Sequence, residues 1–273
     1  MANVFEYLAY KLMGYRLNFL QATSLIHTQS VMKLKAQSNI MVLSYLWWVI
    51  EPLLYGVLFY FIFNWMMFQK SENFFIFILV GKVHFLWFSK SVIAGANSII
   101  ENKGLISQRV IPKYIFPLVN CQELLLKQVI SLLTLMVIVL YCGYSASVTW
   151  LQLIPLTLLM YCFICGISLI ASVFVTYAQD FRVVIQMGMM GLMFTSGIFW
   201  DINLIDDKSV QQALFTYNPL AVLVDCYRQI LLFNQILSLA KLTPVLIWTS
   251  ATIFVGSILL KACGNSLTRK LFL

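Results

Sequence analysis

Charged residues are scarce in this chain. They make up 10% of its 273 residues, whereas soluble globular domains carry about 25%. Hydrophobic residues supply 61% of the sequence, and the mean hydropathy is +0.88. So few charges cannot cover the surface of an ordinary soluble domain. The composition therefore predicts an integral membrane protein.

Motifs for nucleotide hydrolysis and metal binding are also missing. Gly81-Lys82 is followed by Val83 and lacks the upstream glycine of a phosphate-binding loop, so the chain is not expected to hydrolyse ATP by itself. The two histidines, His27 and His84, are too few and too far apart to indicate a metal site. We therefore expect no metal and no cofactor in this chain.

The cysteines give no redox motif in a suitable context. Cys162 and Cys165 have redox-motif spacing, but they lie in the middle of an apolar stretch without a thioredoxin-like βαβ pattern. The other cysteines are scattered through apolar stretches: Cys121, Cys142, Cys226 and Cys263. All six are expected to serve packing.

Apolar segments dominate what is present. A bilayer-crossing helix needs about 20 mostly apolar residues. Segments that meet or approach this length are 40–66, 74–99, 117–141, 151–176, 183–200 and 244–262. We predict an all-α polytopic membrane protein with about six transmembrane helices. Segment 219–239 is interrupted by Asp225 and Arg228, so it favours re-entrant half-helices over a seventh span, which stays possible.

Basic residues flank these segments asymmetrically. One side holds Lys11, Arg16, Lys33, Lys35, Lys103, Arg109, Lys113, Arg182, Arg269 and Lys270. The other side mixes Lys70, Lys208, Arg228 and Lys241 with Glu72, Asp201, Asp206, Asp207 and Asp225. The positive-inside rule then places both termini in the cytoplasm. The net charge of +8 is explained by this topology, so nucleic-acid binding is not needed to account for it.

Residues 1–30 have the pattern of an amphipathic helix lying in the membrane interface. Apolar positions such as Val4, Phe5 and Leu8 share one side, and Glu6 and Lys11 fall on the other. The basic residues expected to gather a lipid phosphate headgroup at the cytoplasmic leaflet are Arg16, Lys33 and Lys35. Alternatively, these cations only set the topology.

Two further segments stand out. Residues 100–116 combine glycine, basic residues and two prolines, which describes a compact protruding element; a basic loop that only obeys the positive-inside rule is the alternative.

Glu51 precedes Pro52 inside the first span, where a lipid-facing carboxylate is costly. We expect Glu51 to face a pore or a partner protomer. Water or a side chain such as Lys127 should satisfy it and the Trp48 carbonyl that Pro52 leaves without its helical donor.

Ordered motifs along nearly the whole chain resemble those of one family. They are Leu43 to Trp47 with Glu51-Pro52; Gly81, Trp87 and Phe88; Asn102 to Ile106 with Pro112; Asp180-Phe181; Ser196 to Trp200; Asn218-Pro219; and Tyr227-Arg228. The chain is similar to the membrane subunits of ATP-binding-cassette exporters of bacterial surface polysaccharide, that is, O-antigen or capsule. Ser44 and Gln179 depart from the family's usual glycine and arginine, which leaves helix packing and a salt bridge there in doubt.

The resemblance implies a homodimeric permease in the bacterial inner membrane. Two copies of a separate ATPase subunit would bind the ATP and Mg²⁺, and a lipid-linked polysaccharide would pass between the protomers. Within transport, the alternative is an exporter of the same architecture for teichoic acid or another substrate. From another class, a membrane-embedded glycosyl- or acyltransferase acting on polyprenyl lipids is the alternative.

The resemblance also implies site residues. The segment expected to couple to the ATPase contains Glu101, Asn102, Lys103, Gly104, Leu105, Arg109 and Lys113. Channel-lining positions are expected at Glu51, Tyr55, Phe59 and Phe199, since aromatic rings suit sugar C–H faces. Residues 201–240 are expected to form an external re-entrant gate, broken at Asn218-Pro219, in which Asp225 pairs with Arg228 one helical turn away.

Overall fold

The structure is a computed structural model that describes residues 18–40, 44–62, 72–108 and 111–272. These residues form helices and connecting turns, with no strand among them, which confirms the all-α prediction. The α-helices are α2 (Phe19–Ile40), α3 (Ser44–Phe61), α4 (Glu72–Glu101), α5 (Lys103–Gln108), α6 (Ile115–Tyr141), α7 (Leu153–Tyr177), α8 (Phe181–Thr195), α9 (Lys208–Tyr217), α10 (Pro219–Leu231) and α11 (Leu239–Leu271). Two 3₁₀ helices, η2 (Val148–Gln152) and η3 (Ile202–Leu204), precede α7 and α9.

The described helices include four that are long and apolar enough to cross a membrane. These spans are Phe74–Glu101, Ile115–Tyr141, Val148–Tyr177 and Leu239–Gly264. Leu46–Leu58 in α3 and Phe181–Thr195 in α8 are shorter apolar helices. Four of the six predicted transmembrane helices are thus long enough to span, and the predicted segments 40–66 and 183–200 correspond to the two shorter apolar helices of this polytopic membrane protein. The segment 219–239 adds no span, because its helix α10 has only 13 residues.

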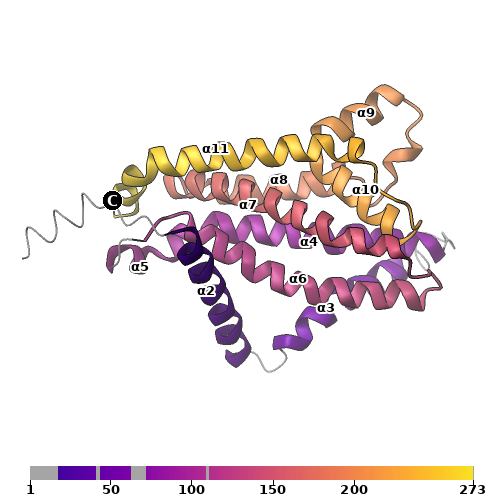
Figure 1. Cartoon of the computed structure of the whole chain (residues 1–273), viewed down its shortest axis with the longest axis horizontal. Helices are drawn as coiled ribbons and strands as arrows, with labels where there is room; N and C mark the ends of the chain where they lie inside the picture. The colour runs from indigo at the N-terminus through magenta and orange to yellow at the C-terminus, as the bar shows by residue number, and fades with distance from the viewer. Residues whose placement is uncertain (1–17, 41–43, 63–71, 109–110, 273) are drawn as a thin grey trace, which may run out of the picture.

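The long helices run side by side, with α4 in the centre (Figure 1). Helix α4 packs against α3, α6, α7, α8 and α10. Helices α7 and α11 approach closely at Gly166, where a Cβ would lie 2.9 Å from the backbone nitrogen of Ile253. Small residues allow such contacts between membrane helices, whose association depends on close packing.

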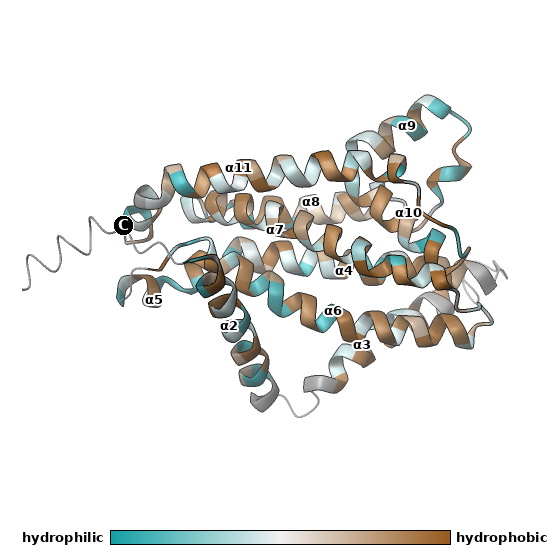
Figure 2. Cartoon of the chain, viewed as in Figure 1, coloured by the Kyte–Doolittle hydropathy of each residue, from teal (hydrophilic) through white to brown (hydrophobic). Residues whose placement is uncertain are grey.

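The two ends of the bundle differ. Helix α2 crosses one end obliquely and packs on α6, and α5 and the C-terminal end of α11 lie at this same end (Figure 1). Helices α9 and α10 lie at the opposite end. Hydrophobic residues predominate along the long helices, and only a few hydrophilic positions interrupt α4 and α6 (Figure 2). Those interruptions are candidates for function, since polar groups are costly there.

The N-terminal prediction is covered only in part. Val4, Phe5, Leu8 and Arg16 lie outside the described residues. Helix α2 continues to Ile40, beyond the predicted limit at residue 30, so Lys33 and Lys35 belong to this oblique helix. The first predicted span, 40–66, begins later in the structure, where α3 starts at Ser44.

Candidate functional site

Helix α5 forms the exposed tip of one end of the bundle. Asn102 separates it from α4, and its side-chain amide donates a hydrogen bond to the Ser98 carbonyl at 2.7 Å. None of the six α5 residues is buried, and Leu105 is 41% exposed. A Cβ added at Gly104 would meet nothing within 4 Å. Together with exposed Glu101, these residues present an open surface of mixed polarity.

Helix α5 and the turn that follows it also contact α11 and the C-terminal residues. Ile106 packs on the apolar cluster that α4, α7 and α11 build at this end. The Lys103 ammonium lies 5.1 Å from the centre of the Phe272 ring, and the Lys113 ammonium donates to the Gly264 carbonyl. Burial lowers the pKa of Lys113. Of the predicted coupling residues, Lys103 thus contacts the end of the chain from α5 and Lys113 ties the turn before α6 to α11, whereas Arg109 lies outside the described residues.

Arg228 is the most heavily bonded buried side chain at the other end. It is 3% exposed, and its guanidinium donates to the carbonyls of Phe77 at 3.1 Å, Gly197 at 2.7 Å and Ile198 at 2.9 Å. The same group stacks 3.4 Å from the centre of the Phe77 ring. Gly197 and Ile198 lie in the turn after α8, where carbonyls lack helical N–H partners. Arg228 thereby ties α4, α10 and the end of α8 together.

Two glycines make room for this arrangement. A Cβ at Gly81 would lie 2.7 Å from Nη2 of Arg228, so α4 can accept the guanidinium only without a side chain there. Gly197 has a φ of 67°, in the left-handed region that favours glycine. The Asn218 amide donates to the Ser196 hydroxyl at 3.0 Å in the same region. Motifs that are far apart in the sequence therefore meet at one place.

The predicted pair between Asp225 and Arg228 is wrong. Asp225 instead forms an ion pair with Lys241 of α11 and accepts hydrogen bonds from Asn203 at 3.0 Å and Gln229 at 3.2 Å. Arg228 is drawn to the open carbonyls beyond α8, and Lys241 supplies the cation that Asp225 needs. Asp225 thus connects α10 to α11 and to η3.

The predicted helix break at Asn218-Pro219 is confirmed. Helix α9 ends at Tyr217, and Asn218 caps α10 by accepting a hydrogen bond from the Ala221 nitrogen at 3.2 Å. Pro219 occupies the first turn, where the missing N–H costs nothing. Helix α9 has no buried residue, whereas every α10 residue except Gln229 is buried. Asp207 begins α9, and hydrogen bonds from Ser209 lower its pKa.

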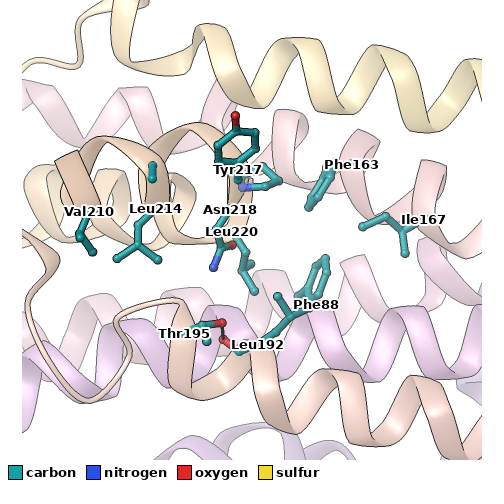
Figure 3. A pocket seen from close by; sticks show the side chains of 12 residues that line it. Phe88, Phe163, Ile167, Leu192, Thr195, Val210, Leu214, Tyr217, Asn218 and Leu220 are labelled. Carbon is teal, nitrogen blue, oxygen red and sulfur yellow. Dashed lines mark hydrogen bonds between the residues drawn. The ribbon is translucent and has the colours of Figure 1, made fainter.

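An open apolar cavity of about 510 Å³ lies beneath α9 (Figure 3). Val210, Leu214 and Tyr217 of α9 line one side, and Leu192 and Thr195 of α8 line another. Its remaining wall comes from α4, α7 and α10, through Phe88, Phe163, Ile167, Asn218, Pro219 and Leu220. This space separates α9 from α8, and α9 is held by its junction with α10 and by the hydrogen bond that Trp248 Nε1 of α11 donates to the Thr216 carbonyl at 3.1 Å.

Glu51 lies in a cleft between α3, α4 and α6. It forms an ion pair with Lys90 of α4. Lys127, which was expected as a possible partner of Glu51, is therefore not its partner. Lys127 instead pairs with Glu123 one turn away, at 2.6 Å. The expected donor for the Trp48 carbonyl is present as the Ser131 hydroxyl, at 3.3 Å. The Trp48 carbonyl that Pro52 leaves without a helical N–H therefore lies within reach of a hydroxyl donor on α6.

The cleft also contains two buried donors. Trp87 and Gln128 line it, and both are 4% exposed. Trp87 Nε1 and Gln128 Nε2 have no acceptor in the part of the chain that the structure describes. Because buried N–H groups are costly without acceptors, the cleft suits ordered water.

The remaining predicted site residues are dispersed. Lys33 donates to the Asn120 side chain at 2.5 Å, and Lys35 is exposed on α2. Tyr55 is half-buried in α3, and Phe199 packs 5.6 Å from Phe194, centre to centre. The side chain of Phe59 lies outside the described part of the chain. Over the described residues, neither the predicted lipid-headgroup residues nor the predicted channel-lining residues form a single closed site within one protomer.

Two lysines of α4, Lys82 and Lys90, were missed by the sequence reasoning as site residues. Each interrupts an apolar span, and an ionisable residue at such a position is a functional candidate by default. That signal was available in the sequence, but Lys82 was considered only as part of an incomplete phosphate-binding motif.

Comparisons of the sequence with known proteins identify a family and several relatives. The pattern that defines the ABC-2 type transporter family matches residues 29–232. An O-antigen export system permease protein RfbA of Klebsiella pneumoniae is 29% identical over 230 residues, covering 83% of this chain and 86% of the relative. RfbA of Myxococcus xanthus is 26% identical, covering 81% and 88%. Polysialic acid transport protein KpsM of Escherichia coli is 26% identical, covering 78% and 83%.

Proposed function

Because the chain belongs to the ABC-2 type transporter family, we propose that it is the channel-forming permease subunit of an ATP-driven exporter of lipid-linked polysaccharide. The substrate class is suggested by relatives named for O-antigen export and polysialic acid transport. In this proposal the protein is a homodimer in the bacterial inner membrane and binds two copies of an ATPase subunit. The glycan passes between the two protomers, because six apolar helices leave little room for a hydrated polymer within one chain.

Helix α5 is the observation that carries the proposal. An ATPase can drive a separate permease only through a contact that transmits movement. Exposed Leu105 and the open surface at Gly104 provide a docking face, while Ile106 and Lys103 connect that face to α4 and to the C-terminal end of α11. Movement imposed on α5 would therefore reach two of the long helices directly.

The same end of the bundle supports an orientation. Helix α5, α2 and the C-terminal end of α11 lie together (Figure 1); α5 carries Lys103 and α11 carries Arg269 and Lys270. We place this end in the cytoplasm, which puts α9 and α10 at the external face. Arg16, Lys33 and Lys35 would then meet the lipid headgroup at the cytoplasmic leaflet, and Lys33 would exchange Asn120 for phosphate.

Helices α9 and α10 form the external gate in this proposal. Helix α9 has no buried residue and lies over an open cavity, and its movement would have to break the hydrogen bond that Trp248 Nε1 of α11 donates to the Thr216 carbonyl at 3.1 Å. At rest helix α10 is held through Arg228 and Asp225, and opening of the gate would release these contacts and expose residues of α10. Asn218 and Pro219 between them are the hinge.

The test is a double substitution at the tip of α5. Gly104→Glu with Leu105→Glu should abolish copurification with the ATPase and stop export, because two carboxylates replace the docking face. The fold should survive, since Gly104 has open space and Leu105 is exposed. The matched control is Leu204→Glu, an 80% exposed leucine at the other end. Normal copurification and export by the α5 variant would refute the proposed coupling role.

A further inference from the structure

Lys82 lies deep in an apolar span of α4. The span begins at Phe74, eight residues earlier, which places Lys82 about 12 Å inside it at 1.5 Å per residue. The residue is 9% exposed. A cation at such a depth is costly unless it has partners. The question is therefore which groups compensate this ammonium.

The contacts that Lys82 makes within the protomer are weak ones. Its ammonium donates to the Met193 thioether of α8 at 3.1 Å, and it lies 5.3 Å from the Tyr55 ring and 5.9 Å from the Phe85 ring. An ammonium has three donors, and a thioether is a poor acceptor. Aromatic faces attract a cation but accept no full hydrogen bond. The Lys82 ammonium therefore has donor capacity that these contacts do not use.

Three other lysines among the described residues are compensated by carboxylates. Lys90, Lys127 and Lys241 each form an ion pair, with Glu51, Glu123 and Asp225 respectively. Over the described residues, no carboxylate lies within ion-pair distance of Lys82. Lys33 and Lys113 also have no carboxylate partner, but each donates to an oxygen acceptor, Asn120 and the Gly264 carbonyl respectively, whereas the hydrogen-bond acceptor found for Lys82 among the described residues is a thioether.

The position of Lys82 links it to the proposed path. Its ammonium lies between Tyr55 of α3 and Met193 of α8, two helices that flank α4. Both helices also expose large apolar residues, including Leu54 on α3 and Phe194 on α8. An amphipathic substrate with an anionic group would find hydrocarbon and aromatic contacts beside a cation.

We infer that Lys82 is an anion-binding residue of the translocation path, which recognises a phosphate or carboxylate group of the exported substrate. This inference rests on the proposed export function. Either the phosphate of a lipid carrier or the carboxylate of an acidic sugar would supply the oxygen acceptors that Lys82 lacks. Charge-assisted hydrogen bonds to such oxygens are the stronger class of hydrogen bond, and they gain strength where water is sparse.

A binding experiment tests the inference without transport. The purified protein is placed in phosphatidylcholine nanodiscs, which carry no net anionic lipid, and titrated by calorimetry with dodecyl phosphate, sodium glucuronate and, as the neutral probe, dodecyl maltoside. We expect Lys82→Met to weaken binding of at least one anion by about tenfold or more, and Lys82→Arg to retain it. Lys208→Met, which removes a lysine of exposed α9, should leave binding unchanged.

The probes distinguish the two sources of the anion. Loss confined to dodecyl phosphate assigns Lys82 to the carrier phosphate, and loss confined to glucuronate assigns it to an acidic sugar. Equal anion binding by wild-type protein and Lys82→Met overturns the inference. So does an equal loss of dodecyl maltoside binding, because a general packing defect would then explain the result.

An export assay separates this inference from the proposed function. The gene is deleted in the source cells, and surface polysaccharide is measured after complementation with wild-type, Lys82→Met or Lys82→Arg protein. If wild-type protein restores no polysaccharide while anion binding depends on Lys82, the export proposal fails and the anion site stands. If wild type and Lys82→Met restore export equally, the role of Lys82 in translocation is refuted.

Discussion

At the scale of single residues, Arg228 should be the most sensitive position at the end of the bundle opposite α5. Replacing it with Met leaves the carbonyls of Phe77, Gly197 and Ile198 without this donor. Each buried carbonyl that loses its donor costs about 1–3 kcal/mol. We expect Arg228→Met to lower the free energy of unfolding by several kcal/mol, measured by denaturation in detergent. Arg228→Lys should recover only part, because an ammonium cannot reach three carbonyls in one plane.

The glycine beside Arg228 offers a matched comparison. Gly81→Ala places a Cβ 2.7 Å from Nη2 and should destabilise the protein by about 1–3 kcal/mol. Gly188→Ala in α8 meets nothing within 4 Å and should be neutral or stabilising by up to about 1 kcal/mol. Similar unfolding energies for the two variants would show that the guanidinium does not need the space at Gly81.

The partner of Glu51 can be identified by double-mutant cycles. We expect Glu51→Leu to impair export and Glu51→Gln to be milder, since the amide still accepts a hydrogen bond. Export rates should be non-additive for Glu51→Gln combined with Lys90→Met, because the two side chains form an ion pair. Combination with Lys127→Met should be closer to additive, since Lys127 pairs with Glu123. The reverse order of coupling would restore Lys127 as the partner.

At the scale of elements, helices α9 and α10 should respond differently to an impermeant thiol reagent. Val224 of α10 is fully buried, whereas Tyr217 of α9 is 74% exposed. In a Cys142→Ser background, Tyr217→Cys should react rapidly whether or not export is active. Val224→Cys should react slowly at rest and faster during export, if the gate lifts α10. Equal protection of Val224→Cys in both states would identify α10 as a static part of the fold.

At the scale of the whole molecule, labelling of cysteines also tests the orientation of the protein in the membrane. Cys142 is exposed just after α6, at the end of the bundle opposite α5. It should react with an impermeant maleimide from outside intact spheroplasts. A cysteine at exposed Ser107 of α5, again with Cys142→Ser, should react only after permeabilisation. Labelling of Ser107→Cys in intact cells would reverse the proposed orientation.

The sequence by itself determined the membrane class, the positions of the apolar helices and the break at Asn218-Pro219. These features depend on local properties: the length of an apolar run, and a side chain that caps a helix beside an imino acid without an N–H. The family resemblance likewise came from the order of short motifs. Local patterns therefore sufficed to predict the all-α fold.

Only the tertiary structure decided which polar groups meet. Asp225 and Arg228 are one helical turn apart, yet Asp225 pairs with Lys241 and Arg228 bonds the carbonyls beyond α8. Glu51 likewise pairs with Lys90 of α4. Inside an apolar bundle a polar group must bond whatever the packed helices bring within reach, and the rotation and depth of each helix are set by contacts far apart in the sequence.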